Sequence, residues 1–266
     1  MSWITARRRR PVAGYAVVLL GLLAVGGGYA ALAATGGQAN ASAPAAKSTQ
    51  IDQGRQLFVA NCSTCHGLEA QGTSTAPSLI GAGAAAVYFQ VSTGRMPLKE
   101  IEAEAPRKPP VLNEKQTLAI AAYIQSLGGG PTIPAPEQVS TNGADAGLGQ
   151  ELFTENCSQC HNFVGAGGAL TYGKYAPALT QSTPTQIYTA MQTGPEAMPV
   201  FNDTTITPSE KRDIIAYITQ TRSEPNPGGF SLGRVGPVTE GLVGWIGGIG
   251  GLILVAMWIT AKRRVH

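Results

Sequence analysis

Two long uncharged stretches stand near the two ends of the chain. Residues 11–34 and 241–261 contain no charged side chain, and the second stretch is bounded by Glu240 and Lys262. A helix of about 20 apolar residues is long enough to cross the hydrocarbon layer of a bilayer. The pattern therefore predicts an N-terminal transmembrane signal-anchor at 11–34 and a transmembrane helix at 241–261. For the first stretch a cleaved signal peptide is the alternative, because small residues suited to cleavage follow it.

Basic side chains gather just beyond both stretches, at Arg7–Arg10 and Lys262–Arg264. Clusters of this kind mark the cytoplasmic side of a membrane segment. Both termini, residues 1–10 and 262–266, are thus predicted to be cytoplasmic, and everything between the two spans to be extracytoplasmic. The chain is expected to be a multi-pass protein of the plasma membrane.

The part between the stretches repeats itself. Residues 54–66 align with residues 149–161 and share the glycine, the Leu-Phe pair, the Asn-Cys-Ser triplet and a final Cys-His. Each copy opens with a helical pattern and closes with another, at 54–61 and 114–127 in the first copy. The second copy has its patterns at 149–156 and 209–221, and Ser209 after Pro208 is typical of a helix start.

The repeat predicts a mainly α-helical protein with two tandem domains, at 48–128 and 145–223. The Pro- and Gly-rich residues 129–144 form the expected linker, and residues 35–47 and 224–240 the expected flexible tethers to the spans. The copies differ in two loops, a longer one at 100–110 in the first and an insertion at 165–175 in the second. Domains of about 80 residues with few helices cannot bury much apolar surface unaided, so another group is expected to fill each core.

Charge excludes one class of function. The formal net charge of the chain is +3, but seven of the 19 basic residues lie at the two ends. The part between the spans contains the other twelve basic residues and all 16 acidic residues, so its net charge is −4. A nucleic-acid-binding protein needs a basic surface to follow the phosphate backbone. We therefore expect no nucleic-acid partner.

The motif Cys-x-x-Cys-His occurs twice, as Cys62, Cys65 and His66 and as Cys157, Cys160 and His161. It is the attachment motif of haem c, in which two thiols bind the porphyrin covalently and the histidine ligates the iron. Three other uses compete. A disulfide leaves the repeated histidine unexplained, a zinc site needs four ligands per unit, and a thioredoxin-like motif needs βαβ surroundings. The sequence therefore predicts two covalently attached haems c.

The second axial ligand of each iron is expected to be a methionine, because the third histidine, His266, lies at the cytoplasmic end. Met96 precedes a proline in the first copy, and Met198 does so at the matching point of the second. Met191 competes, but it aligns with Val91 and is expected to pack in the core. Iron held by histidine and methionine has both axial positions filled and a raised potential, which suits a one-electron carrier.

Aromatic side chains recur at matched or nearby positions and are expected to wall the porphyrins: Tyr88, Phe89, Tyr123, Tyr188 and Tyr217. Arg95, next to Met96, has two open interpretations. It is either a partner of a haem propionate or a solvated surface residue.

The order of these motifs resembles class I cytochrome c, twice over. The chain also resembles the dihaem cytochrome c subunit of the actinobacterial cytochrome bc1 (bcc) complex over about residues 48–261, in segments such as 85–97, 105–108, 167–170 and 173–177. The resemblance implies a subunit of a quinol–cytochrome-c reductase that relays electrons and makes no bonds itself. It also implies a cytochrome b subunit, a Rieske iron–sulfur subunit and an aa3-type cytochrome c oxidase as partners in one supercomplex.

Two other classes remain open from the sequence. One is a dihaem subunit of another membrane enzyme, such as a cbb3-type oxidase or a quinoprotein dehydrogenase. The other is a dihaem peroxidase, which needs an exchangeable iron site that two methionine ligands would remove.

Overall fold

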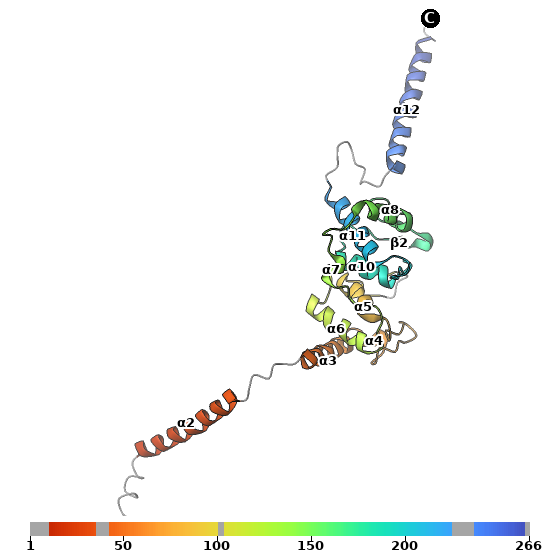
Figure 1. Ribbon diagram of the computed structural model, residues 1–266. Coiled ribbons are helices and arrows are strands. Elements are labelled where there is room, and N and C mark those ends of the chain that lie inside the picture. Colours follow the sequence, from red (N-terminus) through yellow and green to blue (C-terminus); the bar gives the residue numbers. More distant parts are fainter. Residues whose placement is uncertain (1–10, 36–42, 101–103, 225–236, 264–266) are drawn as a thin grey trace, which may run out of the picture. The chain divides into compact units, whose positions relative to one another are not determined.

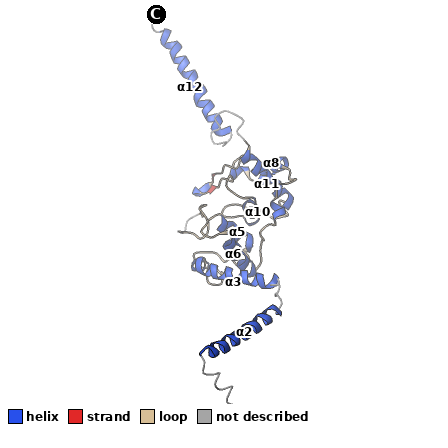
Figure 2. Ribbon diagram, turned by 90° about the vertical axis from the view of Figure 1, so that its left-hand side faces the viewer, coloured by secondary structure: helices blue, strands red, loops and turns tan. Residues whose placement is uncertain are grey.

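The computed structural model describes residues 11–35, 43–100, 104–224 and 237–263 (Figure 1). The chain divides into two compact units, residues 1–49 and 50–266, and each is considered by itself. Nearly all of the regular structure is helical, as Figure 2 shows, which confirms the mainly α architecture. The predicted cytoplasmic segment 1–10, and most of the predicted tethers, lie outside the described residues.

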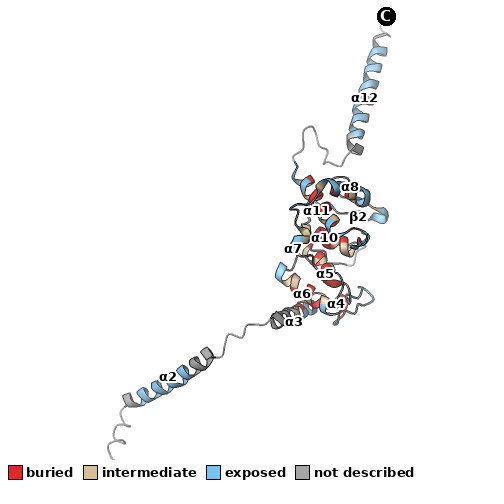
Figure 3. Ribbon diagram, viewed as in Figure 1, coloured by how far each residue is buried: buried red, intermediate tan, exposed pale blue. Residues whose placement is uncertain are grey.

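The apolar ends form helices α2 (Pro11–Thr35) and α12 (Pro237–Arg263). Within α12, the 21 residues of Gly241–Ala261 are long and apolar enough to cross a membrane, and their side chains are exposed (Figure 3). An exposed apolar helix of this length needs lipid or a partner around it. In α2 the apolar segment among the described residues, Gly14–Gly28, is shorter than a span. The N-terminal anchor therefore stays a prediction.

The described residues of the first repeat form four helices: α3 (Ala43–Asn61), α4 (Ser63–His66), α5 (Gly83–Ser92) and α6 (Glu114–Ser126). Helix α6 begins at a capping box in which the Asn113 side chain accepts a bond from the Gln116 amide and the Gln116 side chain accepts one from the Asn113 amide. This arrangement satisfies two backbone donors that the first helical turn leaves unpaired.

The second repeat contains four helices: α8 (Ala146–Asn156), α9 (Ser158–His161), α10 (Pro184–Thr193) and α11 (Pro208–Ser223). The predicted linker 129–144 contains a further short helix, α7 (Pro136–Val139). Helix α11 starts one residue before the predicted Ser209, because Thr207 and Glu210 form its capping box. Between α9 and α10 lies an antiparallel pair of two-residue strands, β1 (Gly168–Ala169) and β2 (Tyr175–Ala176), linked by the 3₁₀ turn η1 (Thr171–Gly173). The pattern of the sequence did not predict this hairpin, which lies in the insertion of the second copy.

The first and last helices of each repeat cross at a glycine. A Cβ atom on Gly54 of α3 would overlap the carbonyl oxygen of Ala119, and one on Gly149 of α8 would overlap that of Asp213. Close by, aromatic rings pack in the same tilted geometry, with centroids 5.5 Å apart for Phe58 and Tyr123 and 5.3 Å apart in the second repeat. The repeat in the sequence is thus a repeat of one helix crossing.

One expectation needs correction. Residues 35–47 are predicted to be a flexible tether, but α3 already begins at Ala43, eleven residues before Gly54, where the helical pattern of the repeat starts. Ala43, Ala45 and Ala46 favour a helix, and Pro44 stands in the first turn, where proline is tolerated. Residues 36–42 of this segment lie outside the described part of the chain.

We predict that Gly149→Ala destabilises the second repeat. The added methyl group forces α8 and α11 apart, and overpacking of this kind costs roughly 1–3 kcal/mol. Urea unfolding of the purified full chain, followed by circular dichroism, measures the effect. Gln150→Ala, on the exposed side of the same helix, is the matched control and should leave stability unchanged. Equal stability of the two variants would contradict the tight crossing.

Candidate cofactor sites

The two Cys-x-x-Cys-His segments form the same turn. In the first repeat the Cys62 amide donates to the Phe58 carbonyl at 2.8 Å, and the His66 amide donates to the Cys62 carbonyl at 3.0 Å. The second repeat reproduces both bonds, at 2.8 Å for Cys157 and 2.9 Å for His161. The thiols and the imidazole therefore follow directly on the helix whose crossing holds each repeat together.

Both imidazoles are oriented by a proline carbonyl. The Nδ1 atom of His66 lies 2.8 Å from the Pro77 oxygen, and that of His161 lies 3.0 Å from the Pro177 oxygen. A carbonyl only accepts, so each Nδ1 donates this bond, and in the neutral imidazole the free lone pair then lies on Nε2. Burial lowers the pKa of His161, against a smaller opposing effect of the bond to Pro177, and this favours the neutral, ligating form.

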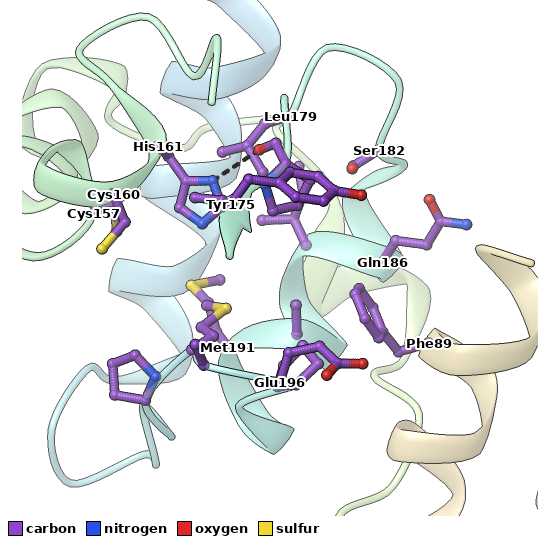
Figure 4. Close-up of a pocket in the computed structure, with 18 of the residues that line it drawn as sticks. Phe89, Cys157, Cys160, His161, Tyr175, Leu179, Ser182, Gln186, Met191 and Glu196 are labelled. Carbon is purple, nitrogen blue, oxygen red and sulfur yellow. Dashed lines mark hydrogen bonds between the residues drawn. The ribbon is translucent and has the colours of Figure 1, made fainter. Parts of the chain in front are cut away.

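A cavity of about 310 Å³ opens beside His161 (Figure 4). Cys157, Cys160 and Met198 also line it, so the four residues predicted for the second haem meet at one place. Its walls are mainly apolar and include Phe153, Leu179, Ile187, Phe201, Ile214 and Ile218. An apolar cavity of this kind with a few converging polar groups is typical of a cofactor site.

The methionines differ in their surroundings. Met198 is half-buried at the cavity and packs on the edge of the second core, whereas Met191 is 2% exposed and belongs to that core, although it also borders the cavity. In the first repeat, Met96 packs on the edge of the core formed by Phe58 and its neighbours, as Cys62 does. These positions agree with Met191 as a packing residue. Ligation of iron by Met96 and Met198 stays a prediction.

The thiols are not arranged for other cysteine chemistry. None of the four described cysteines forms a disulfide. Burial, with a smaller effect of the neighbouring cysteine, raises the pKa of Cys62 to about 11 and that of Cys157 to about 12. Redox-active Cys-x-x-Cys motifs instead have a lowered thiol pKa. Over the described ranges, no three or more His, Cys, Asp and Glu side chains are grouped as a metal ion would require.

The residues present fit a haem c. Two thiols for covalent attachment, an imidazole with a free Nε2 and a thioether all border the second cavity, whose apolar walls suit a porphyrin. The first repeat supplies the same donor types, with the same hydrogen bond on its histidine.

Residues of the first repeat also line the second cavity, which the sequence did not suggest. Phe89 projects from α5 toward it (Figure 4), and Arg95 borders it as well. Glu104, Ala105 and Arg107, from the longer loop of the first copy, complete this wall. The only signal in the sequence was the length of that loop.

Hydrogen bonds join this loop to the second repeat. Arg107 donates to the Gln181 carbonyl at 2.9 Å and to the Ser182 hydroxyl at 3.2 Å. The Tyr175 amide donates to the Glu104 carboxylate at 3.1 Å, which connects the loop of the first copy to the insertion of the second. The two segments in which the copies differ therefore contact each other.

Gln186, at the start of α10, forms a second connection. Its side-chain nitrogen lies 3.1 Å from the Ser92 hydroxyl at the end of α5, and its side-chain oxygen accepts a bond from Arg107 at 3.4 Å. One buried amide thus contacts both the helix and the loop of the first repeat.

The aromatic residues expected to wall the porphyrins have divided roles. Phe89 lines the second cavity, although it belongs to the first repeat. Tyr123, Tyr188 and Tyr217 instead belong to the helical cores, and the Tyr217 hydroxyl donates to the Phe163 carbonyl at 2.8 Å. Tyr88 is partly buried on α5, a helix that contacts α10 of the second repeat.

Comparison with known proteins supports this assignment. The family model "Cytochrome c" matches residues 51–128, and the model "Cytochrome C oxidase, cbb3-type, subunit III" matches residues 144–218. The "Cytochrome bc1 complex cytochrome c subunit" of Corynebacterium diphtheriae is 44% identical over 97% of this chain and 98% of its own length. The protein of the same name from Mycobacterium leprae is 48% identical over 92% of this chain and 87% of its own. The chain belongs to the family of cytochrome bc1 complex cytochrome c subunits.

Membership of this family confirms the predicted pair of cytochrome c domains, and such domains imply haem c as the cofactor. A more distant similarity is to the "Cbb3-type cytochrome c oxidase subunit FixP" of Bradyrhizobium diazoefficiens, which is 30% identical over 48% of this chain and 44% of its own length. It covers too little of either protein to change the family.

We predict that Arg107→Ala weakens the contact between the two cytochrome c domains. The change removes three hydrogen bonds to the second domain. A buried hydrogen bond of a charged group contributes about 1.5–3 kcal/mol to stability. Because Arg107 is only half-buried, we expect the free energy of unfolding to fall by roughly 1–3 kcal/mol in total. Thermal unfolding of the holoprotein measures the loss.

Arg55→Ala is the matched control for Arg107→Ala, because Arg55 forms an exposed ion pair with Glu69 in the first domain. Exposed pairs contribute at most about 1 kcal/mol. Unfolding of Arg107→Ala at the same temperature as Arg55→Ala would contradict the role assigned to the loop.

Proposed function

We propose that this chain is the dihaem cytochrome c subunit of a respiratory quinol–cytochrome-c reductase. It relays single electrons from a Rieske iron–sulfur centre toward an aa3-type terminal oxidase. One haem c is attached at Cys62 and Cys65, and the other at Cys157 and Cys160. The observation that carries the proposal is the doubled Cys-x-x-Cys-His turn with a proline-oriented histidine, in a chain of the bc1 cytochrome c family.

His66 and Met96 would hold the iron in the first domain, and His161 and Met198 would hold it in the second. A bound haem c supplies a one-electron iron couple. The hydrogen bonds to Pro77 and Pro177 hold each Nε2 toward the ligand position. Met96 and Met198 would supply the second protein ligand of each iron and so would leave no exchangeable position for oxygen or peroxide, and the subunit itself would make and break no bonds.

The contact between the domains supports a relay within one chain. Hydrogen bonds from Arg107 and Gln186 connect the domains, and part of the wall of the second cavity comes from the first domain. Cofactors held next to such an interface exchange electrons without diffusion of a separate carrier. This arrangement suits a subunit that replaces a soluble cytochrome c inside a supercomplex.

The membrane topology is part of the proposal. α12 anchors the haem domains, its exposed apolar residues are covered by lipid or by a cytochrome b subunit, and 262–266 face the cytoplasm. Residues 11–34 form a second anchor, which brings the N-terminus to the same side. The haem domains then lie on the extracytoplasmic side.

A cbb3-type oxidase subunit is the second candidate, since the model of that name matches residues 144–218. The bc1 assignment is preferred because those relatives match nearly the whole chain, the C-terminal helix included, whereas the cbb3-type relative matches less than half.

We predict that Met198→Ala removes the thioether–iron charge-transfer band of one haem and leaves two haems attached per chain. The thioether is lost from the iron while all four cysteines remain. Optical spectra of the oxidised protein, together with pyridine-haemochrome quantification, measure both quantities. Met191→Leu is the matched control, because it keeps the volume of a core side chain without a sulfur. Loss of the band in Met191→Leu instead would identify Met191 as the ligand.

Purification of the tagged full chain from its own membranes in mild detergent tests the partners. We predict that cytochrome b, a Rieske protein and an aa3-type oxidase copurify, and that the complex consumes oxygen with a quinol and no added soluble cytochrome c. An oxidase or a quinoprotein dehydrogenase without cytochrome b would contradict the bc1 assignment.

A further inference from the structure

Arg95 lies next to the predicted axial methionine of the first haem, yet its side chain borders the cavity of the second domain. It is only 6% exposed, so it is not the solvated surface residue that one interpretation of the sequence allowed. Its guanidinium carbon is 4.8 Å from the centroid of the Phe89 ring, which lines the same cavity. Arg95 is therefore a buried residue of the cavity wall.

One nitrogen of this guanidinium is buried without a partner. The Nη1 atom of Arg95 has no hydrogen-bond acceptor within the described part of the chain. A buried, charged donor left unpaired is strongly unfavourable, and native proteins rarely contain one unless a bound group satisfies it. The position of Arg95 on the cavity wall indicates that the group bound in the cavity supplies the acceptor.

Neighbouring charged groups already have other partners. Arg107 donates to Gln181, Ser182 and Gln186, as described above. The Glu104 carboxylate accepts from the Tyr175 amide, and the Glu196 carboxylate accepts from the Ala105 amide at 3.4 Å. Both carboxylates also attract Arg95 electrostatically, but neither accepts a hydrogen bond from it, and its buried Nη1 atom has no acceptor in the described chain.

The chemistry of the expected ligand matches that donor. A haem carries two propionate carboxylates, and a carboxylate placed in an apolar cavity needs a cation or several donors to remain charged. Guanidinium offers parallel N–H groups suited to a carboxylate. We propose that Arg95, a residue of the first domain, is the cationic partner of a propionate of the second haem. The inference rests on the proposed haem at Cys157 and Cys160.

The proposal has an electrostatic consequence. Reduced iron carries one positive charge less than oxidised iron, so a nearby cation favours the reduced form and raises the midpoint potential. Without Arg95 the potential of the second haem should fall. The unpaired propionate would also bind a proton more readily, which makes that potential depend on pH near neutrality.

Redox titration of the full-length holoprotein in detergent, at several pH values, tests this. Arg95→Met keeps the aliphatic packing on Phe89 but removes the charge, and Arg95→Lys restores a charge. We expect Arg95→Met to lower the potential of the second haem and to give it a new pH dependence, and Arg95→Lys to reverse part of both changes. Arg95→Gln is a second neutral variant if Arg95→Met does not accumulate.

Two controls make the assignment specific. Arg55→Met removes an exposed cation of the first domain and should move neither potential. Met198→Ala identifies which reduction step belongs to the second haem, since it changes the ligand of that iron alone. Haem quantification comes first, because a chain without a second attached haem refutes the proposed function rather than the role of Arg95.

Three results would overturn the proposal. The first is an Arg95→Met protein whose two potentials and their pH dependence equal those of the parent. The second is a shift of the midpoint potential of the first haem alone, which would make Arg95 a partner of the haem of its own domain. The third is equal behaviour of Arg95→Met and Arg95→Lys, which would assign the effect to packing rather than to charge.

Discussion

The close crossing of the first and last helix in each repeat is the constraint on which the other features depend. Gly54 and Gly149 allow the backbones to approach because no Cβ atom stands between them and the facing carbonyls. The Cys-x-x-Cys-His turn follows directly on the crossing helix, so the crossing fixes where the thiols and the imidazole begin. A larger side chain at either glycine would displace the whole ligand set.

Domains as small as these repeats need a further group to complete their cores. The helices enclose a core, but in the second repeat an apolar cavity remains beside His161. A covalently held porphyrin would complete that core, and it cannot be lost when the domain opens briefly. The same group that is proposed to transfer electrons would therefore also supply the apolar surface that about 80 residues cannot provide alone.

The two copies have become different where they meet. The longer loop of the first copy supplies Glu104 and Arg107, and the insertion of the second supplies the hairpin that ends at Tyr175. Their contact makes the second cavity a shared structure, with Phe89 and Arg95 in its wall. The segments in which the repeats differ thus form an interface. Because of this interface, residues of both repeats line the second cavity.

The sequence by itself determined the helical class, the repeat, the C-terminal apolar helix and the four residues that meet at the second cavity. These follow from local pattern: helical periodicity, a motif of five residues, and a methionine at the same point in each copy. Only the tertiary structure decided that α3 begins at Ala43 and that Pro77 and Pro177 orient the histidines. It alone also showed that Arg95 lines the cavity of the other domain. Such contacts join residues far apart in the chain, and no local periodicity reports which long-range partners a side chain meets once the domains pack together.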